Sequence, residues 1–331
     1  PTDTAVTITY TGTVLQLYKR PGTPPILAAD PLTNTVVATY DLVEGANACA
    51  DNSGATVIVD PVEIRKELLS TGPFVPGQYV IFRLSMAIPS GDTQDVIFTD
   101  YFPLPVFDVA TINTTYGGPD IYRATGAPAA TADTMNLTPV VTVNPATNAL
   151  ILTYPNINTT APQVVAVDVR VRVMPNAFAD NLFLTNIFRA TSNNTDNEAA
   201  IGETPTQIHV RAPALSMTKG VLSTNGAGTI APPPSTLPVD GNLSGADAGD
   251  QVVYRLTIEN TGGAPAYDVV ATDSVPAGLI GCAVTATQLS DGTPLTSSGN
   301  LFTTGLKLIR GGNPDAIVLD AAGSATDTAW V

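Results

Sequence analysis

The chain repeats itself at long range, and this constrains its fold more than any other feature. The run Val80–Leu84 (VIFRL) is answered by Val252–Leu256 (VVYRL). The run Asp95–Asp100 is answered by Asp268–Asp273, and each of these is followed three residues later by a proline. Self-similarity at this distance is typical of arrays of similar modules. It favours building, spacing and binding roles over catalysis.

Composition and patterning predict an all-β protein made of tandem Ig-like β-sandwich modules. The 331 residues suffice for two domains, and 28 prolines with 27 glycines separate short apolar, β-branched runs. In residues 164–173, apolar and charged side chains alternate, which is typical of a strand with one buried face. Many short strands between turn signals indicate β-sandwiches. One helix is expected over residues 61–70, where a proline precedes apolar residues at helical spacing.

A further match sets the module boundaries. Residues 8–19 match residues 208–219, so residues 1–13 are expected to be a strand resembling the end of a preceding module. The first β-sandwich module, with insertions, then covers residues 14–213, and the second covers residues 214–331.

The second module is expected to lack its last strands. It has no counterparts of the strands predicted at Leu184–Ala190 and Gln207–Arg211 of the first module. Either the polypeptide continues and completes the sandwich, or another chain supplies the missing strands.

The charge balance excludes two classes of partner. With 29 acidic and 14 basic residues, the formal net charge is −15. Such a surface repels nucleic-acid phosphates and anionic membranes, and no apolar run of about 18 residues is present to span a membrane. Two explanations of the acidity stay open, solubility of an exposed protein and cation binding.

No catalytic or redox motif is present, so the chain is not expected to be an enzyme. The single histidine, His209, alternates within a strand-like run and lacks a cysteine or acidic partner at useful spacing. There is no nucleophile elbow, phosphate loop or dinucleotide fingerprint. Cys49 and Cys282 have no CxxC partner, which argues against zinc, and no disulfide is inferred. No cofactor is expected, with calcium as the one candidate.

Oxygen-rich side chains mark two candidate sites. The run Ser192–Glu198 contains Asn193, Asp196 and Glu198, whose oxygens suit calcium. Its spacing departs from the EF-hand pattern, and a solvated hairpin loop is the alternative interpretation. Arg83 with Arg255, and Asp100 with Asp273, recur in both modules. A structural pair or a turn cap explains them, and metal ligation is the alternative.

One block resembles a known family. Residues 249–278 contain an Asn260-Thr261-Gly262 turn, a strand that ends at Asp273 and a Pro276-Ala277-Gly278 corner. Leu184-Thr185-Asn186 and Thr218-Lys219 match the family's late strand and the opening of its next repeat. The block resembles the bacterial surface repeat catalogued as domain of unknown function eleven. The resemblance implies an Ig-like β-sandwich that occurs in tandem in large cell-surface proteins, usually without catalytic residues.

These observations predict a non-enzymatic, extracellular structural unit of a cell-surface stalk, layer or filament. Self-association with identical copies or neighbouring repeats is expected, and the strand Thr4–Tyr10 is the candidate donor to the second module of the next copy. The alternative function is an adhesin whose modules bind a glycan or a protein. A third is a secreted hydrolase fragment whose catalytic domain lies outside this chain.

Overall fold

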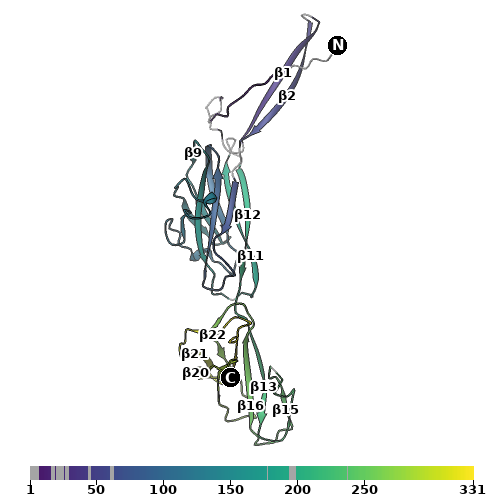
Figure 1. The fold of residues 1–331 in the computed structure, drawn as a ribbon, viewed down its shortest axis with the longest axis vertical. Coiled ribbons are helices and arrows are strands. Elements are labelled where there is room, and N and C mark those ends of the chain that lie inside the picture. The colour runs from purple at the N-terminus through teal and green to yellow at the C-terminus, as the bar shows by residue number, and fades with distance from the viewer. Residues whose placement is uncertain are drawn as a thin grey trace. The chain divides into compact units, whose positions relative to one another are not determined.

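The computed structural model describes residues 7–15, 19, 26, 30–43, 46–59, 63–176, 178–193, 199–236 and 238–331. Strands form almost all of the regular structure, and the described helices are two short 3-10 turns, η1 (Val109–Thr111) and η2 (Ala129–Thr131) (Figure 1). The predicted all-β fold is confirmed. The chain divides into two compact units, residues 1–71, 79–174 and 185–207, and residues 72–78, 175–184 and 208–331.

The first unit contains a long hairpin that forms a sheet of its own. β1 (Pro31–Val43) pairs antiparallel with β2 (Ala46–Ile58). Large apolar side chains are exposed along it, among them Val36 at 61% and Val37 at 60%. A two-stranded sheet without a covering layer is marginally stable in water. The core of the unit is therefore formed by its other strands.

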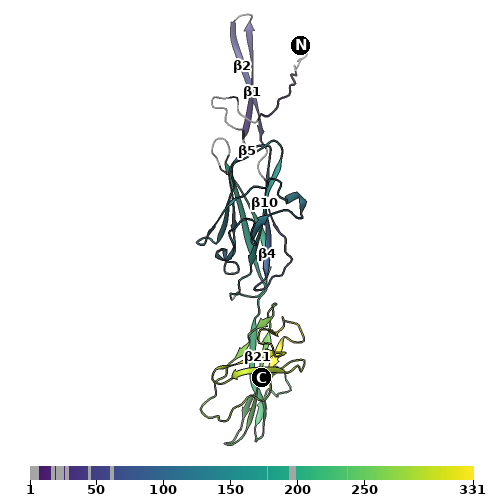
Figure 2. The same cartoon turned by 90° about the vertical axis from the view of Figure 1, so that its left-hand side faces the viewer.

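Two antiparallel sheets enclose that core, and β4 and β10 lie side by side in Figure 2. The first sheet has the order β3 (Glu63–Leu68), β4 (Tyr79–Ile88), β10 (Gln163–Arg172), β6 (Ile121–Arg123). The second has the order β12 (Ala199–Val210), β11 (Leu182–Asn193), β5 (Gly91–Tyr101), β8 (Ala149–Thr153), β7 (Val140–Asn144), with β9 (Ile157–Thr159) also on β5. Phe82 and Leu84 alternate inward from β4 and are fully buried, as are Phe98 and Phe188 of the facing sheet.

The helix expected over residues 61–70 is wrong. Its described part contains strand β3, in which Lys66 is buried and Leu68 partly buried. The apolar residues Ile64 and Leu68 fit the spacing of a helix. They also fit the alternation of a strand, in which Ile64, Lys66 and Leu68 lie on one face. Pairing with β4 decided between the two, because tertiary context overrides local propensity in a half-buried strand.

The second unit has two main sheets. The larger has the order β13 (Leu215–Thr224), β16 (Val252–Asn260), β23 (Thr328–Trp330), β19 (Gln288–Leu289). The smaller has the order β18 (Val270–Ala271), β21 (Gly305–Arg310), β20 (Leu295–Asn300). Two pairs complete it, β14 (Thr229–Ala231) with β15 (Asn242–Ser244) and β17 (Ala266–Tyr267) with β22 (Ile317–Leu319). A leucine-rich core, including Leu289, Leu308 and Leu319, joins these strands.

The sequence repeat is also a backbone repeat. Arg83 lies opposite Glu67 of the first strand in its sheet, and Arg255 lies opposite Gly220 at the same register. Asp95 and Asp268 match as well, with left-handed φ of 52° and 48°. Because such φ values are uncommon for residues other than glycine, this agreement identifies β18 as the counterpart of part of β5.

The leading strand expected at residues 4–10 is not formed in the part that is described. Residues 7–15 belong to no sheet, and the side chains of Ile8 and Tyr10 are 83% and 69% exposed. A strand requires a neighbouring edge to pair with, and no such pairing is present for these residues. The predicted module boundaries at residues 13 and 213 stay predictions. Among the described residues, no helix combines the length and the hydropathy needed to cross a membrane.

Candidate functional site

A buried ion pair joins the two sheets of the first unit. Lys66 projects inward from β3, and its Nζ contacts Oδ1 of Asp100 on β5. The side chains of both residues are 0% exposed. Charged residues are almost never fully buried unless they are paired. Removing two charges from water is unfavourable by several kcal/mol, so this pair is a candidate for function rather than for stability alone.

Asn186 of β11 lies beside this pair. β11 pairs with β5 so that Phe188 lies opposite Asp100. Asn186 is two residues before Phe188, and therefore on the same face of the strand and diagonal to Asp100. Its exposure is 0%. Lys66, Asp100 and Asn186 thus converge from three strands at one point in the core.

Three polar atoms at this point have no hydrogen-bond partner in the described part of the chain. They are Oδ2 of Asp100 and both Nδ2 and Oδ1 of Asn186. Burial raises the pKa of Asp100, and the Asn186 amide is close enough to that carboxyl to oppose the shift, although neither of its polar atoms forms a hydrogen bond of good geometry. Each buried unpaired polar group is unfavourable by about 1–3 kcal/mol. Three of them in one place require an explanation.

The surroundings of the site are apolar and aromatic. Nζ of Lys66 lies 4.7 Å from the ring centre of Phe82 and 5.6 Å from that of Phe102. The rings of Phe82 and Phe107 meet edge to face at 6.5 Å, and Phe188 packs against Phe98 at 5.0 Å. These rings exclude water from the amine, the carboxyl and the amide.

Burial shifts both titratable groups toward their neutral forms. It lowers the pKa of Lys66 from 10.5 to about 8, although Asp100 opposes the shift. It raises the pKa of Asp100, although Lys66 and Asn186 oppose that shift. A neutral amine is a nucleophile, and a carboxylic acid kept neutral by an apolar site can donate a hydrogen bond.

Two other buried asparagines show what a structural role demands. Nδ2 of Asn148 donates to the carbonyls of Phe102 and Phe107, both at 2.9 Å. Nδ2 of Asn260 donates to the carbonyls of Ala264 and Asp320, both at 2.8 Å. Their Oδ1 atoms accept backbone N–H groups. Asn186 differs from both, since it has none of these bonds.

The second unit contains a similar lysine–aspartate pair. Nζ of Lys219 lies 2.7 Å from each carboxylate oxygen of Asp273. Lys219 lies opposite Leu256, as Lys66 lies opposite Leu84. Its side chain is 37% exposed and that of Asp273 is 18% exposed. Asp100 and Asp273, which recur in the sequence, therefore each pair with a lysine, and the pair rather than the turn cap explains them.

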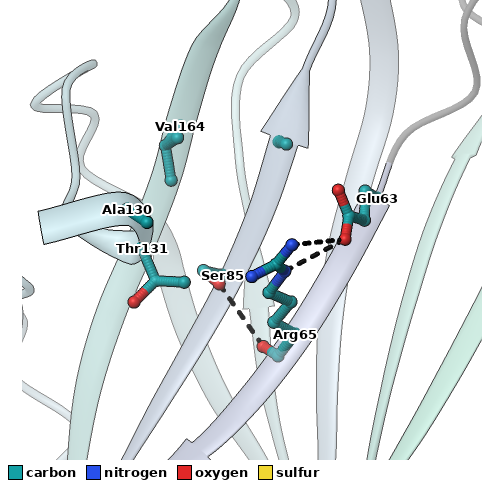
Figure 3. Close-up of a pocket in the computed structure, with 7 residues that line it drawn as sticks. Glu63, Arg65, Ser85, Ala130, Thr131 and Val164 are labelled. Atoms are coloured by element: carbon teal, nitrogen blue, oxygen red, sulfur yellow. Dashed lines mark hydrogen bonds and ion pairs between the residues drawn. The ribbon is translucent and has the colours of Figure 1, made fainter. Parts of the chain in front are cut away.

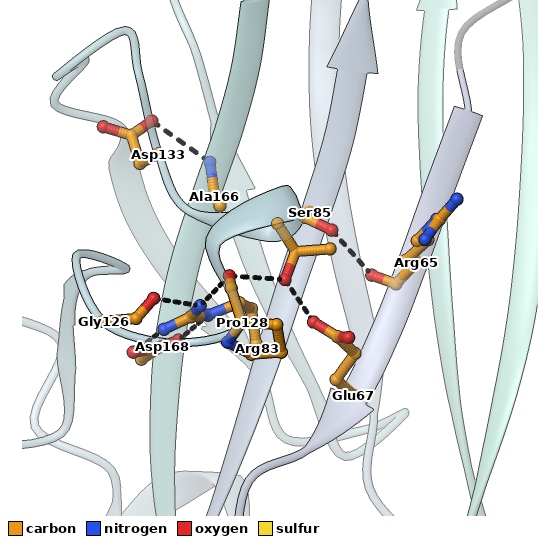
Figure 4. Close-up of polar contacts among 10 residues, drawn as sticks. Arg65, Glu67, Arg83, Ser85, Gly126, Pro128, Asp133, Ala166 and Asp168 are labelled. Carbon is orange, nitrogen blue, oxygen red and sulfur yellow. Dashed lines mark hydrogen bonds and ion pairs between the residues drawn. The ribbon is translucent and has the colours of Figure 1, made fainter.

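The recurring Arg83 has a different partner, on the outer face of its sheet. Nε and Nη2 of Arg83 donate to the two carboxylate oxygens of Asp168 at 2.7 and 2.9 Å. Nη1 donates to the carbonyls of Gly126 and Pro128 at 2.9 and 3.1 Å (Figure 4). Arg83 is 1% exposed because the segment around η2 covers it. Every group of this network is satisfied, which indicates a structural role.

A small hollow lies near this network. Glu63, Arg65, Ser85 and Thr131 line it, and Arg65 points to Glu63 through bonds of 2.8 and 3.0 Å (Figure 3). Its volume is about 90 Å³. Pockets for small organic molecules measure roughly 300–1,000 Å³. The hollow is therefore too small to hold such a ligand.

The predicted calcium site is described only in part. Nδ2 of Asn193 donates to Oδ2 of Asp95 at 2.7 Å, while Asp196 and Glu198 lie outside the described residues. Within the described residues, no cluster of three or more acidic, histidine or cysteine side chains is suited to a metal ion. Calcium binding by Asn193, Asp196 and Glu198 stays a prediction.

Histidine and cysteine positions offer no further site in the described chain. His209 stacks on Phe183 at 4.3 Å, and its Nε2 is 2.7 Å from Oδ1 of Asn181. The thiol of Cys282 is free and exposed. The side chain of Cys49 lies outside the part that is described.

The sequence pattern points to Asp100 but predicts no role for Lys66 or Asn186. Lys66 falls within the expected helix, and Asn186 falls within a strand motif. A signal for Lys66 was present, because it takes an inward position between Ile64 and Leu68 in an alternating run. A lysine at such a position requires a buried partner.

No protein-family model and no curated protein sequence matches the chain. Among solved structures, it is similar to BcpA, the major pilin subunit of Bacillus cereus, with 12% identity and a TM-score of 0.34 over 86% of this chain and 76% of that one. It is also similar to the C-terminal domain of the Streptococcus agalactiae antigen I/II polypeptide BspA, with 12% identity and a TM-score of 0.33 over 80% and 88%. For the C-terminal domain of the Streptococcus pyogenes antigen I/II-family protein AspA, the TM-score is 0.32 at 12% identity. That match covers 49% of this chain and half of the other. The resemblance to domain of unknown function eleven stays a prediction.

Proposed function

We propose that this chain is a structural module of an extracellular, cell-surface stalk, layer or filament, assembled head to tail by strand donation. The observation that carries the proposal is a sheet edge in the second unit that has no neighbour among the described strands. β5 of the first unit has β11 on one side and β8 on the other. Its counterpart β18 pairs with β21 alone among the described strands. Among the described strands, none takes the place of β11 there.

This edge of β18 borders buried groups. Ala271 of β18 and Val269, the residue that precedes this strand, are each 4% exposed. The nearby Lys219–Asp273 pair is accessible to solvent. An unpaired sheet edge can pair with a strand of another chain, because the N–H and C=O groups along the edge lack hydrogen-bond partners. A strand added at β18 would cover this pair.

The N-terminal segment supplies the chemistry of a donor. Val6, Ile8 and Tyr10 alternate with threonines, and the side chains of Ile8 and Tyr10 are exposed. Such a strand adds main-chain hydrogen bonds and places apolar side chains at alternate positions in the acceptor. Because donor and acceptor surfaces differ, the contact is heterologous, and repetition gives an open filament unless the rotation closes a ring.

Analytical ultracentrifugation of the full chain and of a variant that lacks residues 1–13 tests the proposal. The full chain should form concentration-dependent assemblies, and the shortened chain should stay monomeric. Paired substitutions provide a matched control. Ile8→Lys with Tyr10→Lys should block assembly, whereas Thr7→Lys with Thr9→Lys, on the opposite face of the same segment, should weaken it less. Assembly that is unchanged by the deletion would show that the donor is wrong. An adhesive role stays a prediction from the sequence.

A further inference from the structure

We propose that the side chains of Lys66 and Asn186 become joined by an isopeptide bond, formed by the chain itself with Asp100 as the acid–base group. The bond would link β3 of one sheet to β11 of the facing sheet, inside the first unit. It would be a covalent modification of the folded protein, and it does not depend on filament assembly.

The unpaired polar atoms of the site support this bond. In the unreacted site, Oδ2 of Asp100 and both polar atoms of Asn186 lack partners in the described chain. The reaction removes Nδ2 of Asn186 as ammonia. It leaves one amide N–H and one C=O next to the carboxyl of Asp100, which can accept from the first and donate to the second. One bond thus accounts for all three atoms, which an ion pair between Lys66 and Asp100 leaves unexplained.

The three side chains supply everything that the reaction needs. Nζ of neutral Lys66 attacks Cγ of Asn186, while the acid form of Asp100 donates a hydrogen bond to Oδ1 and stabilises the developing oxyanion. Asp100 then accepts a proton from Nζ and transfers a proton to Nδ2. The Cγ–Nδ2 bond breaks, and ammonia leaves as the new Cγ–Nζ amide forms. No oxidant, cofactor or other reactant is consumed.

The surroundings of the three side chains favour the reaction. The rings of Phe82 and Phe102 lie over the amine, and all three reacting side chains are almost or completely excluded from solvent. A dry site keeps the amine nucleophilic and prevents hydrolysis of the reacting amide. Holding the groups together in the folded core converts a slow bimolecular reaction into an intramolecular one, which supplies a large part of the acceleration.

Similar side chains elsewhere in the described chain lack one or more features of the Lys66–Asp100–Asn186 site. Lys219 and Asp273 form the equivalent pair, but β18 beside them has no neighbour in the place of β11 among the described strands. Asn148 and Asn260 are buried carboxamides, but their hydrogen bonds are made. Among the described residues, only those of the first unit bring an amine, a carboxyl and an unpaired carboxamide together.

Mass spectrometry of the purified full chain tests the proposal directly. The intact mass should be lower than the sequence mass by one ammonia molecule. Succinimide formation at an asparagine also releases ammonia, so the deciding observation is a branched tryptic peptide. Trypsin does not cleave at a blocked lysine, and the branched product should therefore join residues 66–83 to residues 173–189. A full-length mass equal to the sequence mass, without the branched peptide, would overturn the proposal.

Variants separate the three roles. Lys66→Arg, Asn186→Ala and Asp100→Ala should each abolish the branched peptide, and circular dichroism should show that each variant keeps its strand structure. Asn148→Ala and Lys219→Arg should retain the peptide in full. If the Asp100→Ala variant forms the bond at the same rate as the unaltered chain, the role of Asp100 is wrong. The chain that lacks residues 1–13 should still give the branched peptide. The outcome of this test is therefore independent of the outcome of the assembly test.

Discussion

Lys66 and Lys219 occupy the same register position in their two units, each opposite a leucine of the neighbouring strand and each paired with an aspartate. The environments differ, since the side chain of Lys66 is 0% exposed and that of Lys219 is 37% exposed. The repeated lysine–aspartate pair is therefore buried in one unit and accessible to solvent in the other.

Amine labelling should distinguish the two lysines. In the native protein, a water-soluble acetylating reagent should modify Lys219 and leave Lys66 unmodified, because only Lys219 meets solvent. Peptide mapping after brief labelling measures both sites. In urea, Lys66 should remain unmodified if the proposed bond has consumed its amine, whereas it should become reactive in the Asn186→Ala variant. Labelling of Lys66 in the unfolded, unaltered chain would contradict the bond.

Loss of the cross-link should lower the stability of the first unit. The bond would close a loop of about 120 residues, and by analogy with a disulfide this contributes about 4–5 kcal/mol to the free energy of unfolding. Urea titration of the Asn186→Ala variant should show the first unit unfolding at a lower concentration. The transition of the second unit serves as the internal control and should not move. A shift of both transitions would indicate a general loss of structure instead.

Removal of Arg83 should destabilise the first unit strongly. Arg83→Met leaves Asp168, which is 6% exposed, without its bidentate partner, and breaking a buried pair from one side is unfavourable by about 3–5 kcal/mol. The double variant Arg83→Met with Asp168→Leu should recover much of this loss, because no unpaired charge remains. Arg255→Met is the matched control. It removes a contact with the Trp330 ring at 4.7 Å and should change stability by about 1 kcal/mol or less.

Asn260→Ala should destabilise the second unit through the turn that follows β16. Its Oδ1 accepts the N–H groups of Ala214 and Gly262, both at 3.1 Å, and its amide bonds two carbonyls. Buried groups left unpaired are unfavourable by about 1–3 kcal/mol each. Thermal unfolding should show a loss of several degrees or more. The neighbouring Thr261→Ala, at an exposed position, should have a smaller effect.

The stability of the second unit should depend on Asp320 in acid. The hydroxyl of Thr326 and the guanidinium of Arg310, 2.9 Å away, lower the pKa of Asp320 below its ordinary 3.8. The folded unit thus binds this proton less tightly than the unfolded chain. The contribution of Asp320 is present above the ordinary pKa and is lost as the pH falls through the lower, folded value. The difference in unfolding free energy between the unaltered chain and Asp320→Asn should therefore shrink from pH 7 toward about pH 2. A constant difference would contradict this cause.

The all-β class and the internal repeat can be read from the amino-acid sequence alone. β-branched alternation and turn residues specify strands locally, and the recurrence of Val80–Leu84 at Val252–Leu256 needs no structure to be seen. It also singled out Asp100 and Asp273, because they end corresponding runs. These features are local or periodic, and a single chain displays them directly.

The meeting of Lys66, Asp100 and Asn186 depends on tertiary packing and cannot be predicted from local sequence. They lie on three strands far apart in the sequence, and the register of β11 on β5 and the packing of β3 across the core bring them together. The same packing turned the expected helix at residues 61–70 into strand β3, because pairing with β4 outweighs local propensity. Burial, rather than residue type, then made an ordinary lysine and aspartate unusual, since desolvation depends on what surrounds a side chain in space.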